Sequence, residues 1–137
     1  MSEVRRLIDT STLSDVLRQR SPEIQKRARD YLIAHNCFTF SLFTRFEILR
    51  GLHAKGAKSQ LKQFGEFCAR SEIIPINDEI IVKAAEIYGL LRTQGRLIDD
   101  IDILIAATAL VHQFGLITEN TDHFNRVPGL QIESWRP

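Results

Sequence analysis

The sequence predicts an α/β fold in which a mostly parallel sheet of four or five strands lies between two layers of helices. Short apolar segments alternate with longer segments of helical periodicity along the whole chain. Helical connections of this kind return each strand to the same direction, which is typical of a parallel sheet. The 137 residues suit one hydrophobic core, and no linker or repeat divides them. We therefore expect one domain over residues 1–137.

The first half of the chain is predicted to begin with a buried strand and to alternate from there. Ser21 and Ser41 stand where helix N-caps are expected, and Pro22 suits the first position of a helix. Asn36 is a plausible end for the helix that begins at Pro22. The predicted strands cover residues 4–8 and 37–40, and the predicted helices cover residues 12–20, 22–35, a segment after Ser41, and 57–69.

The second half is predicted to contain two long helices and three short strands. Asn77 can cap the first of these helices and Gly95 can close it. Pro75 favours an edge or a terminus for the strand in which it lies. One face of the first helix carries Ile80, Ala84, Ile87 and Leu91. The predicted strands cover residues 73–76, 115–118 and 130–133, the second helix covers residues 101–114, and a polar loop precedes the last strand.

Composition excludes several classes of protein. The net charge of +1 is too small for a protein that holds nucleic acid by charge alone, although it does not exclude an RNA substrate. No apolar run approaches the roughly 20 residues that cross a bilayer, so we expect a cytoplasmic protein without a membrane partner. Cys37 and Cys68 lack the spacing of a zinc site, and we expect free thiols.

Three acidic residues are candidates for a metal site. Asp9 ends the first apolar strand, at the sheet edge where ligands of such folds bind. Glu47 lies within a helix among apolar neighbours, and it can equally be a solvated surface residue. Asp102 opens the most apolar helix, where an acid also suits the helix dipole. Ala106 and Ala109 follow Asp102 on the same face, and these small residues favour close packing that carries Asp102 inward.

Further oxygen ligands follow the strand at residues 115–118. Asn120 and Asp122 lie in this polar segment, and a buried carboxylate such as Asp102 needs a cation or another partner. Carboxylate and amide oxygens select Mg²⁺ or Mn²⁺ over zinc. Spacing alone leaves open whether these side chains converge.

The sequence resembles the PIN domains, and among them the VapC-type toxins of toxin–antitoxin pairs. The resemblance covers nearly the whole chain and rests on five fragments in order. Ser11 stands where the family usually has Asn, and His123 stands where an acid is common. The fragments are Leu7-Ile8-Asp9-Thr10-Ser11, Phe46-Glu47-Ile48-Leu49-Arg50-Gly51, Asp102-Ile103-Leu104-Ile105-Ala106-Ala107-Thr108-Ala109, Thr118-Glu119-Asn120-Thr121 with Phe124, and Arg126-Val127-Pro128-Gly129-Leu130 with Trp135.

The resemblance implies a PIN-like three-layer α/β/α domain that hydrolyses RNA phosphodiester bonds with Mg²⁺. Asp9, Asp102 and Glu47 would be the metal-binding and catalytic acids, with Glu47 either ligating metal or acting as a base. Asn120 and Asp122 would complete the site, and either can be its fourth contributor. Ser11 would position Asp9 or a phosphate oxygen. Arg50, Arg92 and Arg96 would bind the substrate backbone, although each can equally be a solvated surface residue.

The resemblance also implies partners. We expect an RNA substrate, a small antitoxin protein that neutralises the enzyme, and a homodimer. The candidate contact surface consists of apolar residues on the early helices, unless these serve the monomer core: Leu13, Val16, Leu17 and Tyr31. Two alternatives stand beside this interpretation. One is a catalytically silent binding scaffold with the same fold, and the other is an unrelated metal-dependent phosphohydrolase.

Overall fold

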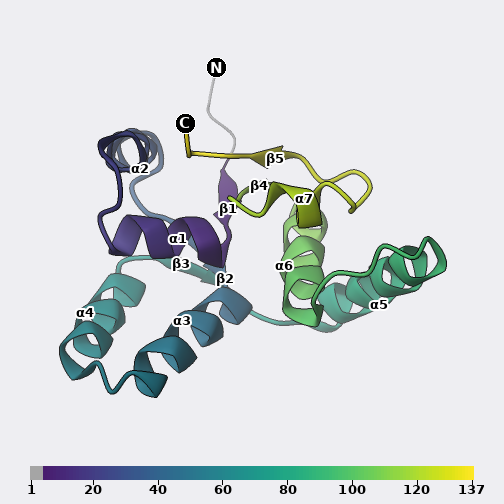
Figure 1. Cartoon of the computed structure of the whole chain (residues 1–137), viewed down its shortest axis with the longest axis horizontal. Helices are drawn as coiled ribbons and strands as arrows, with labels where there is room; N and C mark the ends of the chain where they lie inside the picture. The colour runs from purple at the N-terminus through teal and green to yellow at the C-terminus, as the bar shows by residue number, and fades with distance from the viewer. Residues whose placement is uncertain (1–4) are drawn as a thin grey trace.

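A five-stranded, fully parallel sheet forms the centre of the protein (Figure 1). The structure is a computed structural model and describes residues 5–137. The strand order is β3-β2-β1-β4-β5, so the first strand is central. The strands are β1 (Arg6–Ile8), β2 (Thr39–Ser41), β3 (Glu72–Ile74), β4 (Gly115–Ile117) and β5 (Ile132–Glu133). The predicted fold class is confirmed, with strands shorter than the sequence pattern suggested, and Val4 lies outside the described residues.

Helices cover both faces of the sheet (Figure 1). One group consists of α1 (Thr10–Leu17), α2 (Pro22–His35), α3 (Leu42–Ala54) and α4 (Lys58–Ala69). The other side carries α5 (Asp78–Thr93) and α6 (Asp100–Val111), which pack closely against each other. The short helix α7 (Thr121–Phe124) follows β4, in the segment predicted to be a polar loop. Its four residues are too few to show a helical period in the sequence.

Neighbouring residues of the central strands face two separate cores. Leu7 belongs to the core beneath α5 and α6, whereas Ile8 belongs to the core beneath α1 to α4. Leu116 and Ile117 of β4 divide in the same way. This alternation follows from the two-residue period of a strand. The alternation determines which face of the sheet each side chain of β1 meets. Because β1 ends at Ile8, the next residue, Asp9, lies at the carboxyl edge of the sheet.

Local sequence signals place the first residues of α2, α3 and α5 as predicted, whereas α1 begins and ends earlier than the predicted residues 12–20 and α6 ends at Val111, before the predicted residue 114. The hydroxyl groups of Ser21 and Ser41 accept hydrogen bonds from backbone N–H groups three residues later, at 3.1 Å in each case. The Asn77 carboxamide caps α5 through the N–H of Ile80 at 2.9 Å. Asn36 ends α2 in the left-handed conformation with φ of 72°, which suits Asn at this position. These caps satisfy backbone donors that each helix leaves unpaired.

Two of the four residues predicted to form a contact surface are in the monomer core instead. Leu13 is fully buried, and Tyr31 is 5% exposed with its hydroxyl donating to the Arg6 carbonyl at 3.1 Å. Val16 is half-buried and packs against the same core, so only Leu17 presents substantial apolar surface. Helical periodicity could not separate core from surface here because α1 is covered by α2 and α3.

Among residues 5–137, no helix is long and apolar enough to cross a membrane.

Candidate active site

Asp9 lies directly after β1, in the middle of the carboxyl edge of the sheet. Its side chain is held by two hydroxyl groups, because Thr118 donates to Oδ2 at 2.7 Å and Ser11 donates to the same oxygen at 3.0 Å. The residue is only 3% exposed. Its other oxygen, Oδ1, is buried and has no hydrogen-bond partner within residues 5–137. A buried carboxylate oxygen without a partner is costly, so a cation or a proton is expected there.

The surroundings of Asp9 and Asp102 disfavour the negative charges of their carboxylates. Burial raises the pKa of Asp9 to about 6, and the nearby Asp102 carboxylate adds to the increase, against the lowering effects of the Thr118 and Ser11 hydrogen bonds and of the adjacent Thr10 backbone N–H. Burial also raises the pKa of Asp102, with a further contribution from Asp99 and an opposing one from His123. Two carboxylates that repel each other in a buried site are stabilised together by a divalent cation.

Asp102 reaches the site from the first turn of α6. Ala106 and Ala109 are fully buried, as the close packing of this helix face predicted. The Asp102 Oδ2 lies 3.2 Å from His123 Nδ1 and 3.5 Å from the Asn120 amide nitrogen. His123 Nδ1 also lies 2.9 Å from that amide nitrogen. The segment after β4 therefore holds Asp102 through Asn120 and His123.

Glu47 is joined to the residue that follows Asp9 and is held by its own contacts. Thr10, the residue after Asp9, donates its hydroxyl to Glu47 Oε1 at 2.5 Å. Arg50 lies one turn further along α3 and approaches Oε2 at 3.5 Å. The side chain of Glu47 is 21% exposed, so it is neither buried in the core nor a free surface group. No three His, Cys, Asp or Glu side chains among residues 5–137 form a ready-made metal cage, and the expected three-carboxylate cluster is not assembled.

The remaining candidates lie further from these acids or point to solvent. Asp122 is exposed on α7, and its neighbour His123 occupies the position beside Asp102. Arg92 and Arg96 are exposed at the end of α5 and in the loop that follows it. Arg50 is exposed as well, with its guanidinium stacked 5.2 Å from the Phe46 ring centroid. The predicted role of Ser11 in positioning Asp9 matches its hydrogen bond.

Two functional contacts had no signal strong enough for sequence reasoning. Thr10 stands out in the sequence only as part of the fragment Leu7–Ser11, whereas its hydroxyl joins α1 to Glu47. Glu119 stands out only as part of the fragment Thr118–Thr121, yet its side chain is 3% exposed and accepts several hydrogen bonds from residues 134–136. The sequence feature that could have identified Glu119 is its position between Thr118 and Asn120, which both face the site. Because side chains alternate along an extended backbone, an acid between them points to the opposite side.

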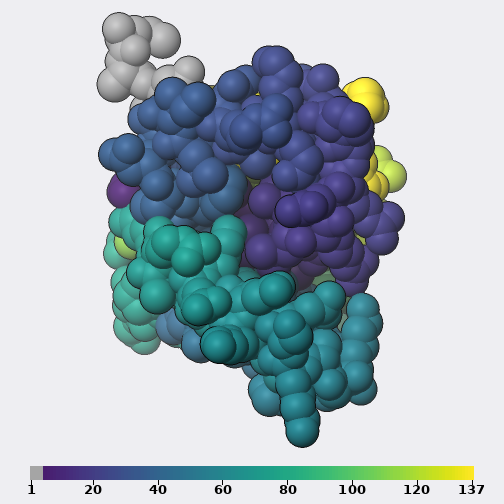
Figure 2. Space-filling model, turned by 90° about the vertical axis from the view of Figure 1, so that its left-hand side faces the viewer, coloured from purple at the N-terminus to yellow at the C-terminus, as the bar shows by residue number. Residues whose placement is uncertain are grey.

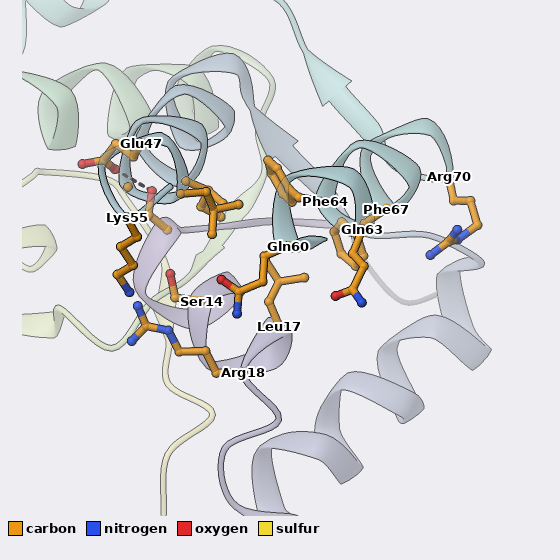
Figure 3. Close-up of a pocket in the computed structure, with 14 residues that line it drawn as sticks. Ser14, Leu17, Arg18, Glu47, Lys55, Gln60, Gln63, Phe64, Phe67 and Arg70 are labelled. Carbon is orange, nitrogen blue, oxygen red and sulfur yellow. Dashed lines mark hydrogen bonds between the residues drawn. The ribbon is translucent and has the colours of Figure 1, made fainter. Parts of the chain in front are cut away.

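A cavity of 410 Å³ opens next to Glu47, between α1, α3 and α4. It lies on the face of the molecule that Figure 2 presents, where α1 and α4 adjoin. Glu47 lies at one end of the cavity and Arg70 at the other (Figure 3). Leu17, Phe64 and Phe67 contribute apolar surface between them. Arg18 and Lys55 also line the cavity, so this partly apolar groove with one carboxylate and three basic side chains suits a peptide that carries apolar side chains and charges of both signs.

Comparison with known proteins identifies the family of this chain. The family model of the PIN domain matches residues 6–130 of this chain. Ribonuclease VapC1 of Methanocaldococcus jannaschii is 33% identical over 132 residues, which cover 95% of this chain and 88% of the relative. Ribonuclease VapC19 of Mycobacterium tuberculosis is 31% identical over 126 residues, covering 92% and 97% of the two chains.

Solved structures share the fold over the same length. The crystal structure of VapBC2 from Rickettsia felis, bound to a DNA fragment from the promoter, matches with a TM-score of 0.85 and 23% identity, covering 96% of this chain and 98% of that one. The structure of VapBC-1 from nontypeable Haemophilus influenzae matches with a TM-score of 0.78 and 25% identity, covering 95% and 97%. By its fold, its ordered acidic motifs and these relatives, the chain belongs to the PIN-domain family and, within it, to the group of the VapC ribonucleases.

Proposed function

We propose that this protein is a Mg²⁺-dependent endoribonuclease that acts as the toxin of a toxin–antitoxin pair. The observation that supports it most is the unpartnered, buried Oδ1 of Asp9 beside a second carboxylate, Asp102. Mg²⁺ is commonly held by one or two carboxylates together with waters and substrate phosphates, so this pair fits the ion without a third carboxylate. When bound, the ion supplies charge stabilisation for a scissile phosphate and acidifies a water.

The residues of this chain have distinct tasks in the proposal. Asp9 and Asp102 would hold the ion, while Ser11 and Thr118 fix the orientation of the Asp9 carboxylate through Oδ2. Glu47 is the candidate to accept the proton of the attacking water at Oε2, since Thr10 already occupies Oε1. Arg50 lies next to that oxygen and is the arginine best placed to contact an RNA phosphate.

Cleavage of RNA by the purified protein tests the enzymatic proposal. We expect new RNA ends to appear with Mg²⁺ or Mn²⁺ and not with EDTA, and we expect Asp9→Asn and Asp102→Asn each to abolish them. A silent PIN-fold scaffold predicts no ends under any condition. An unrelated phosphohydrolase predicts turnover of a simple phosphate ester instead, and the family assignment argues against it. Cleavage that persists in either variant would refute a shared metal role.

The antitoxin part of the proposal rests on the cavity beside Glu47. The related structure of VapBC-5 from Mycobacterium tuberculosis is described as a member of the VapBC family of toxin-antitoxin systems, and we infer that a small antitoxin binds this chain as well. Its segment would place apolar side chains against Leu17 and Phe67 and a basic side chain next to Glu47. Such a basic group would pair with the carboxylate proposed to accept the proton of the attacking water, which explains how binding would neutralise the enzyme.

A further inference from the structure

Glu119 is a buried acid that the proposed reaction does not use. It lies between Thr118 and Asn120, whose side chains contact Asp9 and Asp102. Its own side chain is 3% exposed and turns the other way, toward the segment 134–136 and helix α1. A carboxylate this deeply buried is retained only when its oxygens are well paired.

The pairing of Glu119 is unusually complete. Oε1 accepts hydrogen bonds from the Ser134 hydroxyl at 2.5 Å and the Arg136 backbone N–H at 3.3 Å. Oε2 accepts from the Trp135 backbone N–H at 3.0 Å and from the Thr12 hydroxyl at 3.2 Å. The carboxylate therefore joins three parts of the chain that are distant in sequence: α1, the turn after β4, and residues 134–136.

The segment 134–136 is itself anchored independently of Glu119. Trp135 is 3% exposed and packs in the core beneath α1 to α4. The Arg136 guanidinium contacts Asp15 of α1 at 2.9 and 3.0 Å, and the Asp15 side chain is 6% exposed. Glu119 is thus tied to a fixed support and not to a loose tail.

The backbone of Glu119 faces the metal site. Its N–H donates to the Ser11 hydroxyl at 3.1 Å, and that hydroxyl donates onward to Asp9 Oδ2 at 3.0 Å. The Thr118 hydroxyl accepts from the Asn120 N–H at 2.9 Å and donates to the same Asp9 oxygen. Any shift of the Thr118–Asn120 turn would move the donors that orient Asp9 and the amide beside Asp102.

We propose that Glu119 is a positioning residue, which locks the Thr118–Asn120 turn against the segment 134–136 and thereby holds the two metal-binding carboxylates in their working geometry. The inference rests on the proposed function, because the positioning role matters only if Asp9 and Asp102 bind Mg²⁺. Groups that orient metal ligands typically affect metal affinity by about 10- to 100-fold when they are removed.

The test compares Glu119→Gln with Arg136→Ala. Gln keeps the size of the side chain but places an amide NH₂ against donors that need an acceptor. Arg136→Ala removes the guanidinium that pairs with Asp15 at 2.9 Å and lies 3.9 Å from Glu119 Oε1, and it leaves the backbone N–H groups of residues 135 and 136 in place for Glu119. We expect both variants to lower the melting temperature. Only Glu119→Gln should weaken Mg²⁺ binding, by about tenfold or more.

Two measurements by ¹⁵N–¹H NMR separate the possible outcomes. In metal-free protein, Glu119→Gln should shift the backbone amide signals of Ser11, Thr118 and Asn120, whereas Arg136→Ala should leave them within the wild-type pattern. A Mg²⁺ titration of the same signals then gives the dissociation constants. If Glu119→Gln fails to fold, Ser134→Ala removes one donor to Oε1 and should produce a smaller change of the same kind.

Failure of this inference differs from failure of the proposed function. Unchanged amide signals together with wild-type Mg²⁺ affinity in Glu119→Gln would overturn the positioning role. Equal losses of affinity in Glu119→Gln and Arg136→Ala would also overturn it, because both would then reflect stability alone. A wild-type protein that binds no Mg²⁺ would overturn the proposed metal chemistry, and the metal-free spectra would still decide whether Glu119 orders the turn.

Discussion

At the scale of single residues, the ionised form of Asp9 needs partners for both carboxylate oxygens. Two hydroxyl groups satisfy Oδ2, but Oδ1 has no hydrogen-bond partner within residues 5–137, and Asp102 repels the charge. The pKa of Asp9 is consequently raised from 3.8 to about 6. Because the folded state holds the proton more tightly than the unfolded state, metal-free stability falls as pH rises between these two values.

Replacement of Asp9 by Asn should remove this pH-dependent penalty. The difference between 3.8 and about 6 corresponds to about 3 kcal/mol at neutral pH, at about 1.36 kcal/mol per pH unit. In EDTA we therefore expect Asp9→Asn and wild type to be similarly stable near pH 4, and the variant to be more stable above pH 6. Urea unfolding across this range measures it, with the exposed Asp30→Asn as the control.

Addition of Mg²⁺ should reverse the order of these two proteins. A ligand that binds only the folded state stabilises it by mass action, and only wild type keeps both carboxylates. Equal stability of wild type with and without millimolar Mg²⁺ would contradict a cation site at Asp9.

At the scale of elements, α7 decides which residue after β4 reaches Asp102. The helix turns His123 toward Asp102, at 3.2 Å between Nδ1 and Oδ2, and leaves Asp122 exposed. Asn120 precedes the helix and contacts both His123 and Asp102. Four residues of helix therefore place His123 next to Asp102, whereas the sequence offered Asn120 and Asp122 as candidates for the fourth contributor.

His123→Ala should impair RNA cleavage more than Asp122→Asn does. Loss of the imidazole removes a direct partner of Asp102, for which we expect a decrease of about tenfold in cleavage rate at limiting Mg²⁺. Asp122→Asn removes only an exposed charge near the site. Initial rates over a Mg²⁺ series measure both, and a larger defect in Asp122→Asn would show that Asp122 turns inward when substrate or metal binds.

The cavity between α1, α3 and α4 gives a second prediction at this scale. Leu17 lines the cavity and Leu32 of α2 lies outside it, yet both are 36% exposed. We expect Leu17→Glu to weaken antitoxin binding by tenfold or more and Leu32→Glu to leave it unchanged, since a buried charge opposes apolar contact (about 1.4 kcal/mol for each factor of ten). Calorimetric titration with the antitoxin measures both, and equal effects would place the partner elsewhere.

At the scale of the whole molecule, the predicted homodimer requires an exposed apolar surface on the monomer. Ile81, Ala85 and Tyr88 follow one another at i, i+4 and i+7 on α5, and all three are exposed beside the buried face of that helix. Exposed apolar stripes of this kind mark interfaces, and two-fold dimers are the commonest assemblies of identical chains. The early helices offer much less, because Leu13 and Tyr31 are buried.

A homodimer built on α5 should dissociate when this stripe becomes charged. We expect light scattering at micromolar concentration to report a dimer for wild type and a monomer for Ile81→Glu. Leu17→Glu, on the opposite side of the sheet, should remain dimeric. A wild-type monomer, or a dimer that survives Ile81→Glu, would contradict this assignment.

Expression of the protein by itself should arrest bacterial growth if it is a toxin. We expect Asp9→Asn at matched expression to relieve the arrest, and co-expression of a small protein encoded beside it to do the same. Colony counts after induction measure both effects. Equal growth of wild type and Asp9→Asn would favour the silent scaffold.

The sequence by itself determined the features that depend on neighbouring residues. Strand and helix alternation, the caps at Ser21, Ser41 and Asn77, and the emergence of Asp9 after a buried strand all follow from local periodicity and local hydrogen bonding. Those signals were sufficient for the α/β class and for the edge of the sheet where the site lies. The ordered motifs then indicated the family.

Only the tertiary structure decided which distant side chains meet. Thr118 reaches Asp9 across 109 positions because β4 lies beside β1, and Glu119 reaches Trp135 because β5 adjoins β4. Burial of Leu13 likewise depends on helices that cover α1 from elsewhere in the chain. Periodicity gives the face on which a residue lies, but strand order and packing determine what that face meets, and these arise from contacts between segments that no local pattern encodes.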